Sequence, residues 1–173
     1  MLPSYRVKPL SRAKIHNTVR QLKMAIGMEN RLFFPVVQVL ENILPILLPD
    51  FELEIAPVND MPNKEGETYP SKHKIIIRED IYDKACNNDG RSRYTIAHEI
   101  GHLILHENSS VALCRLENIT QIKAYENPEW QANEFASELL APLNLIENLS
   151  VKEIQEKCGV SFSEAKIQLS KIH

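Results

Sequence analysis

The apolar positions along the chain first follow a helical period. Residues at spacings of three and four are apolar near the N-terminus, namely Ile15, Val19, Leu22 and Ile26. Ser11 is placed to cap the start of this helix and Gly27 to end it. A second helix is predicted from Val36 to about Ile46, and Pro45 should bend or end it.

Between residues 51 and 78 the period changes to two. The segment 51–56 alternates, with Phe51, Leu53 and Ile55 on one face and Glu52 and Glu54 on the other. This pattern predicts a half-exposed strand, and residues 73–78 predict a second one. The segment 57–71 is rich in Pro, Asn, Asp and Gly, so we interpret it as a loop with a short extended piece at Thr68 and Tyr69.

The most apolar predicted helix also carries three ionisable side chains. Ser92 can cap a helix that runs to about Leu105, and its apolar residues lie nearly all the way round, so it should be buried. It nevertheless contains His98, Glu99 and His102. Burying such groups is costly unless something pairs with them or coordinates them. Their pattern, His-Glu-x-x-His, predicts a metal site.

Helix geometry explains why this spacing suits a zinc ion. Residues four apart lie about 6 Å apart along one helix face, so the imidazoles of His98 and His102 can converge on one ion. Glu99 is rotated by about 100° from His98, which places its carboxylate beside the ion. There it can take a proton from an activated water and return it to a leaving amine. Zinc is the predicted cofactor, although manganese and iron accept the same ligands.

A catalytic zinc site usually has a third protein ligand, and His106 is a poor candidate for it. His106 shares a helix face with His98 but lies about 12 Å away along the axis, too far to bind the same ion. We therefore interpret His106 as structural.

A later helix offers a better third ligand. Asn127 can cap it and Pro142 follows its end. Its apolar stripe is interrupted by Glu129 and Asn133, which should therefore face inward, Glu129 as the metal ligand and Asn133 as a partner that orients a zinc histidine. Alternatively, Glu129 binds no metal, and its negative charge only interacts favourably with the positive N-terminal end of the helix. If the register differs, the substitutes are Glu126 and Glu134.

The composition is typical of one globular domain. Of the 173 residues, 43% are apolar and 25% are charged. The most apolar neighbourhood, residues 32–51, contains three prolines and several polar residues, which excludes a membrane-spanning helix there. No secretory signal is recognisable at the N-terminus. Because no Cys-x-x-Cys pair occurs, we expect ordinary thiols and a cytoplasmic location; the cysteines are Cys86, Cys114 and Cys158.

Charge is distributed unevenly along the chain. The net charge is -3, yet residues 1–31 hold seven basic residues and one acidic residue, a net +6. We expect the basic residues of the first helix on a solvated face, with a docking surface as the alternative; they are Arg12, Lys14, Arg20 and Lys23.

The last 24 residues contain the capping and turn residues that are typical of a helix-turn-helix. Ser150 and Ser161 each begin a capping box, and Gly159 lies between the two predicted helices. Residues 150–173 carry a net charge of only +1, which is low for a surface that binds phosphates. We therefore expect this pair to pack against the domain rather than to bind DNA.

The residues around these motifs resemble a known family. Residues 93–106 and 129–142 together are similar to the ImmA/IrrE family of bacterial and phage-associated zinc endopeptidases. The resemblance implies that His98, His102 and Glu129 bind zinc and that Glu99 is the general base, in a gluzincin-like arrangement. The family's usual methionine before the final proline is Ala141 here.

The expected fold class is α+β, a small and mainly helical metallopeptidase domain with a short antiparallel sheet packed on the zinc-binding helix. We expect a single domain over residues 1–173. Its parts are N-terminal helices (1–50), a small sheet (51–78), the zinc-site helices (91–142) and a C-terminal helical pair (150–173).

The resemblance also implies a protein substrate, a helix-turn-helix repressor that is cleaved in mobile-element or stress regulation. Strand 73–78 could pair with an extended substrate. Tyr69, His73 and Tyr94 remain open candidates for stabilising the oxyanion. The alternative function is a binding module that keeps a metal for folding and sequesters a repressor or a toxin–antitoxin partner without proteolysis.

Overall fold

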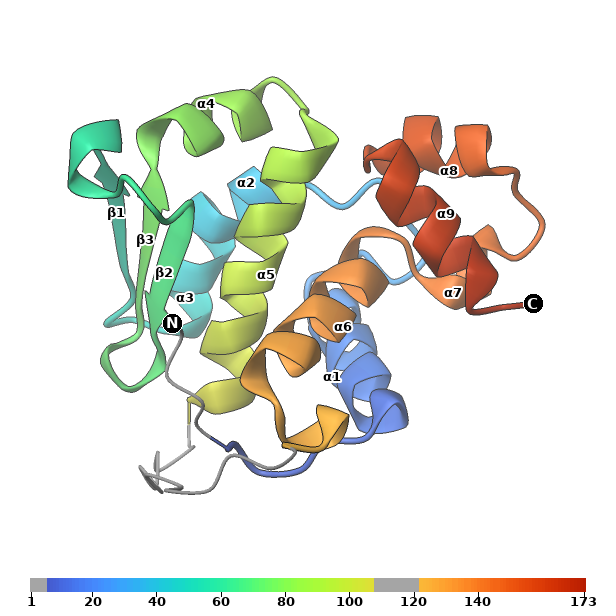
Figure 1. Ribbon diagram of the computed structural model, residues 1–173, viewed down its shortest axis with the longest axis horizontal. Coiled ribbons are helices and arrows are strands. Elements are labelled where there is room, and N and C mark those ends of the chain that lie inside the picture. Colours follow the sequence, from blue (N-terminus) through green and yellow to red (C-terminus); the bar gives the residue numbers. More distant parts are fainter. Residues whose placement is uncertain (1–5, 108–121) are drawn as a thin grey trace.

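Helix α5 (Gly90–His106) lies at the centre of the molecule in the computed structural model, which describes residues 6–107 and 122–173. Figure 1 shows a small sheet on one side of α5 and helices α6 (Pro128–Leu140) and α1 (Arg12–Ala25) on the other. The buried apolar side chains of all these elements form one core. The α+β class expected from the sequence is confirmed.

The N-terminal helices follow the sequence pattern. The Ser11 side chain accepts a hydrogen bond from the Lys14 N–H at the start of α1, and Gly27 adopts a φ of 68° just after its end. The second helical stretch consists of α2 (Val36–Gln38), a π-helical turn (Val39–Ile43) and α3 (Leu44–Leu47). The bend expected near Pro45 is therefore a wide turn that precedes this proline, which has no N–H to donate.

Three strands form a mixed sheet in the order β1-β3-β2. The strands are β1 (Glu52–Ala56), β2 (Gly66–Tyr69) and β3 (Lys74–Arg78), and 3-10 turns lie at Val58–Asp60 and Pro70–Lys72. β2 runs antiparallel to β3, as expected, but β1 runs parallel to it. The expectation of an antiparallel sheet is thus wrong for this pair, because the chain reverses direction twice between β1 and β3 and the two strands then pair directly.

This topology changes the surface that was expected for the substrate. Because β3 is paired on both sides, residues 73–78 have no free edge, and their expected pairing with a substrate is wrong. The strand at the edge beside α5 is β2, which the sequence indicated only as a short extended piece. At the other edge, Ile55 of β1 is 39% exposed, although its alternation had predicted a buried position.

The caps of the remaining helices place them close to the predicted ranges. After α4 (Glu79–Cys86), Asp89 rather than Ser92 caps α5, since its carboxylate accepts the Ser92 N–H at 2.8 Å. Asn127 caps α6 as expected, directly after a 3-10 turn at Ala124–Glu126. The chain ends with α7 (Leu143–Ile146), α8 (Val151–Cys158) and α9 (Phe162–Ser170).

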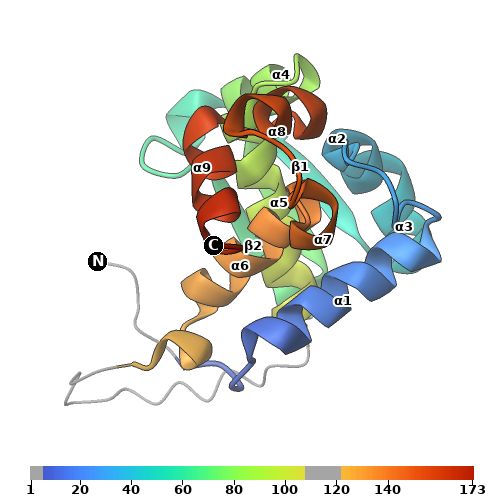
Figure 2. The same ribbon diagram turned by 90° about the vertical axis from the view of Figure 1, so that its right-hand side faces the viewer.

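The C-terminal pair α8–α9 begins at the predicted caps. Ser150 and Glu153 form a complete capping box. Ser161 accepts the Glu164 N–H, but the Glu164 side chain is buried and makes no reciprocal cap. Gly159, with a φ of 65°, supplies the left-handed turn between the two helices. Figure 2 shows α9 of this pair next to α6.

A buried arginine ties this pair to the start of α5. Arg93 is 1% exposed and donates hydrogen bonds to the carbonyl oxygens of Gly159 at 2.9 Å and Phe34 at 2.8 Å. Burial lowers the pKa of Arg93 to about 10, which still leaves the side chain charged at neutral pH. Its guanidinium therefore holds three chain segments together through main-chain oxygens.

The basic face predicted for α1 is only partly solvated. Lys23 is 2% exposed, and burial lowers its pKa. Arg12 forms an ion pair with Glu134 of α6 at 3.1 Å. Two of the four basic residues of α1 therefore contact the rest of the protein and do not lie on a solvated face.

Two further expectations concern cysteines and membranes. Cys86 is exposed and Cys158 is buried, and both are free thiols, whereas Cys114 lies outside the described residues. Within residues 6–107 and 122–173, every helix is too short or too polar to cross a bilayer.

Candidate metal centre

Close packing of α5 on α6 builds the site. A side chain at Gly101 of α5 would bring its Cβ within 3.1 Å of Phe135 Cδ1 and 3.2 Å of the Ala132 carbonyl oxygen, both in α6. The glycine within the His-Glu-x-Gly-His segment therefore lets the two helices approach closely. This approach brings the first turn of α6 over the middle of α5.

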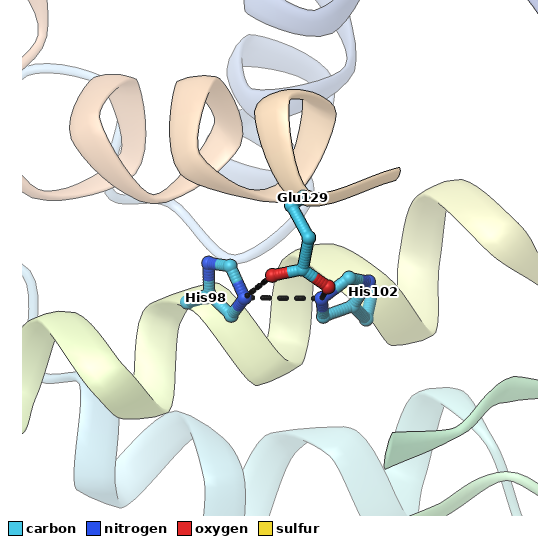
Figure 3. A group of neighbouring side chains, drawn as sticks. All are labelled: His98, His102 and Glu129. Carbon is cyan, nitrogen blue, oxygen red and sulfur yellow. Dashed lines mark hydrogen bonds and ion pairs between the residues drawn. The ribbon is translucent and has the colours of Figure 1, made fainter. Parts of the chain in front are cut away.

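The structure brings His98, His102 and Glu129 together, as Figure 3 shows. The Nε2 atoms of the two histidines are 3.0 Å apart. One Glu129 oxygen lies 3.2 Å from His98 Nε2 and the other 3.2 Å from His102 Nε2. One ligand atom from each residue fits within 4.8 Å of the others, and no other such group occurs in the described part of the chain.

The donor set fits zinc. Two imidazole nitrogens and one carboxylate oxygen form a ligand set that zinc accepts in three-ligand catalytic sites. A glutamate carboxylate such as that of Glu129 is ionised at neutral pH, which is the form that binds cations. The side chain of Glu129 is 46% exposed, which leaves access to the site from solvent.

Asn133 contacts His98 from the outer side. Its Oδ1 lies 2.8 Å from His98 Nδ1 and 3.3 Å from the Tyr94 hydroxyl. Because an amide oxygen only accepts, His98 Nδ1 carries a proton, and in the neutral imidazole the lone pair is then on Nε2, which faces Glu129. The sequence placed Glu129 and Asn133 inward, but Asn133 is exposed and Glu129 is only half-buried. Both residues instead line the open side of the site.

Glu99 is close to this group without belonging to it. It is 7% exposed, and its Oε2 lies 2.5 Å from the Thr68 hydroxyl of β2. Burial raises the pKa of the Glu99 carboxyl, although Thr68 acts in the opposite direction. A Cβ at Gly66 would come within 2.7 Å of Glu99 Cγ, so β2 lies directly against this side chain. Thr68 and Gly66 were not identified from the sequence as contacts of Glu99.

His106 is not part of the three-residue group, in agreement with its exclusion as a ligand. It is 4% exposed and contacts His102 Nδ1 through its own Nδ1 at 3.2 Å. Its Nε2 lies 3.0 Å from Gln131 Oε1 in α6. Burial lowers the pKa of His106 to about 4, so its imidazole is neutral at physiological pH. Gln131 is fully buried, and the apolar stripe of α6 gave no sign of it.

The alternative ligands and two of the oxyanion candidates are engaged elsewhere. Glu134 is 2.7 Å from His16 and 3.1 Å from Lys171, and Glu126 forms an ion pair with Arg6. Asp50 and Glu107 contact the two imidazole nitrogens of His73, and the Lys72 ammonium lies 5.6 Å from the centre of the Tyr69 ring at the end of β2. Tyr94 is the candidate that touches a site residue, through Asn133.

Comparison with protein families assigns the chain to a known family. The model of the family Peptidase_M78, described as the IrrE N-terminal-like domain, matches residues 55–170, about two thirds of the chain. The chain belongs to this family. The match includes the sheet from β2 onward, α5, α6 and every residue of the candidate metal centre. A search of curated proteins finds no match.

Membership of the IrrE-like peptidase family supports a function of the metallopeptidase type. It accords with the His-His-Glu cluster of α5 and α6, which offers the ligands that such an enzyme needs. Ala141, which stands where the family usually has a methionine, is fully buried at the end of α6 and is not one of the candidate ligands.

Proposed function

We propose that the protein is a zinc-dependent endopeptidase in which His98, His102 and Glu129 hold the metal and Glu99 is the general base. The convergence of two histidine Nε2 atoms and one carboxylate within 4.8 Å carries this proposal. The location of Glu99, one residue after His98 and buried under β2, supports its role.

The chain's own groups fit the steps of peptide hydrolysis. A bound zinc ion would supply Lewis-acid activation of water and of the peptide carbonyl. Glu99 takes the proton of the attacking water and later gives it to the leaving amine. Burial of its carboxyl raises its pKa, which makes it a stronger base than a solvated carboxylate. The Thr68 hydroxyl holds one Glu99 oxygen, so the other remains available for the proton.

The edge of β2 is suited to an extended substrate. The Arg78 N–H donates to the Glu65 carbonyl, so alternate residues of this antiparallel pair, Glu67 and Tyr69, direct their backbone groups toward β3. Gly66 and Thr68 then direct theirs outward. Within the described residues, no backbone group pairs with this edge. A peptide added there as a fourth strand would run past Glu99.

We also propose that the substrate is a helix-turn-helix repressor, the class implied by the resemblance to the ImmA/IrrE family. Cleavage would relieve repression in a mobile element or a stress response. We assign this activity to the cytoplasm, where the free thiols of Cys86 and Cys158 would remain reduced.

Mixing the zinc-loaded protein with purified helix-turn-helix repressors from its own genome tests both parts of the proposal. The parent should produce defined fragments, detected by mass spectrometry, and Glu99→Gln should bind zinc normally but cleave at least 100-fold more slowly. Equal cleavage by both proteins would refute the role of Glu99. If Glu99→Gln relieved repression in cells as well as the parent, a binding module that sequesters the repressor would replace the enzyme.

A further inference from the structure

A chain of hydrogen bonds connects His102 to the main chain near the N-terminus. It passes from His102 Nδ1 to His106 Nδ1 at 3.2 Å and from His106 Nε2 to Gln131 Oε1 at 3.0 Å. Gln131 Nε2 then lies 2.9 Å from the Lys8 carbonyl oxygen and 2.8 Å from that of Tyr125. The three side chains of this relay are buried.

The two carbonyl groups determine the position of every proton in the chain. Carbonyl oxygens only accept, so the amide nitrogen of Gln131 must face them and its Oε1 must face His106. This oxygen also only accepts, so His106 Nε2 carries a proton. His106 has no acidic partner in this relay, and in its neutral form Nδ1 is then an acceptor.

The last step concerns the metal ligand itself. Because His106 Nδ1 accepts, His102 Nδ1 must donate, and the neutral imidazole of His102 has no proton on Nε2. The bare Nε2 atom is the one that lies 3.0 Å from His98 Nε2 and 3.2 Å from Glu129. The relay therefore presents a lone pair at the position where the three ligands converge.

We propose that His106 and Gln131 are positioning residues that fix the ring and the tautomer of His102 for metal binding. This inference rests on the proposed metal site. Partners of this kind orient ligating histidines and raise their basicity, and their loss typically weakens metal binding by about 10- to 100-fold.

The two ligand histidines are supported differently. Asn133, the partner of His98, is exposed, so water can replace its oxygen when the side chain is removed. His106 is buried, and the cavity left by its removal would be lined by Gln131 and the His102 ring. Loss of the His106 acceptor should therefore weaken zinc binding more than loss of the Asn133 acceptor does.

Zinc affinity, measured by competition with a chromophoric chelator, tests the role of His106. His106→Phe keeps the ring volume but offers no acceptor, and we expect zinc to bind at least 10-fold more weakly. His106→Asn places an amide oxygen near the former Nδ1 and should recover most of the affinity. Leu139→Ala, a core substitution near the far end of α6, is the matched control and should lower thermal stability without changing zinc affinity.

Parent-like zinc affinity in His106→Phe, or equal losses in His106→Phe and His106→Asn, would overturn the inference. Failure of the parent itself to bind zinc would instead refute the proposed function. Nitrogen-15 NMR of the metal-free parent separates the two cases and needs no substitution. The inference requires the Nδ1–H tautomer of His102, and detection of the Nε2–H tautomer would overturn it even if zinc binds.

Discussion

The Thr68 hydroxyl lies 2.5 Å from Glu99 Oε2, although 31 residues separate the two along the chain. The same hydroxyl lies 3.2 Å from the Glu99 carbonyl oxygen, so β2 contacts both the side chain and the backbone of the proposed general base. The proposed chemistry depends on this edge strand as much as on the helix that carries the motif.

Replacing Thr68 by Val should therefore slow peptide hydrolysis. A hydrogen bond to a charged group contributes about 1.5–3 kcal/mol, so we expect kcat to fall by about 10- to 100-fold with little change in KM or zinc content. Steady-state kinetics on a cleavable peptide measures this effect. Thr68→Ser keeps the hydroxyl and should retain activity; if Ser and Val variants were equally slow, the hydrogen bond would not be the cause.

Gly66→Ala should displace the Glu99 side chain. The new Cβ would lie 2.7 Å from Glu99 Cγ and 2.9 Å from its Oε1, which is too close for either to remain in place. Misplacing a catalytic group by about 1 Å can cost about 100-fold in rate, and we expect a loss of that order in kcat. Glu67→Ala, at the next position of β2, alternates to the other face and is the control. Full activity in Gly66→Ala would contradict the contact.

Removing the metal should destabilise the protein. A ligand that binds only the folded state stabilises it by about 2.7 kcal/mol when its free concentration is 100 times Kd. Thermal unfolding should therefore shift to lower Tm after treatment with a chelator and recover on addition of zinc. Glu129→Gln should show a much smaller zinc-dependent shift, whereas Glu126→Gln should behave as the parent. An unchanged shift in Glu129→Gln would remove it from the ligand set.

The buried carboxylate Glu134 should make stability depend on acidic pH. Burial opposes its ionisation, but contacts with His16, Lys171 and Arg12 outweigh this and lower its pKa from 4.5 to about 2. A pKa that is lower in the folded state stabilises the protein above the unfolded value, and this contribution disappears as pH falls from about 4.5 to about 2.

Urea unfolding between pH 6 and pH 2 measures this contribution, which we expect to be about 3 kcal/mol at most. Glu134→Gln should be less stable than the parent at pH 6, and the difference should shrink toward pH 2. Glu147→Gln, exposed on the surface, should differ little from the parent at any pH. A constant difference between parent and Glu134→Gln would show that ionisation is not involved.

Arg93→Met should destabilise the fold by about 3 kcal/mol, because the carbonyls of Phe34 and Gly159 would lose their buried donor. Chemical denaturation measures the free energy of unfolding. The neighbouring substitution Arg91→Met removes a largely exposed guanidinium and should change this free energy by less than about 1 kcal/mol. Equal effects of the two substitutions would rule out a special role for Arg93.

The sequence could predict those parts of the site that depend on local geometry. His98 and His102 lie four residues apart on one helix, and Asn127 fixes where the next helix begins, so Glu129 could be predicted as the candidate third ligand. These relationships follow from helix rise and capping. The same reasoning predicted α1 and the C-terminal pair.

The remaining parts depend on which distant segments meet. The order β1-β3-β2 decides that β2, and not β3, lies beside Glu99. Gln131 is buried because α6 is covered on nearly every side, whereas the stripe argument assumed one exposed face. Arg93 finds its partners in the main chain of Phe34 and Gly159. Patterns within a single element contain none of this information.

The hydrogen-bond chain behind His102 ends on two carbonyl oxygens, those of Lys8 and Tyr125, and every amino acid possesses such an atom. The identity of residue 8 is therefore immaterial to that support, whereas the path of the backbone at that point is essential to it. Substitutions at position 8 should be tolerated, but a deletion of one residue between position 8 and α1 would move this carbonyl oxygen away from the Gln131 side chain. Homologues that share this support would keep the spacing rather than the residue.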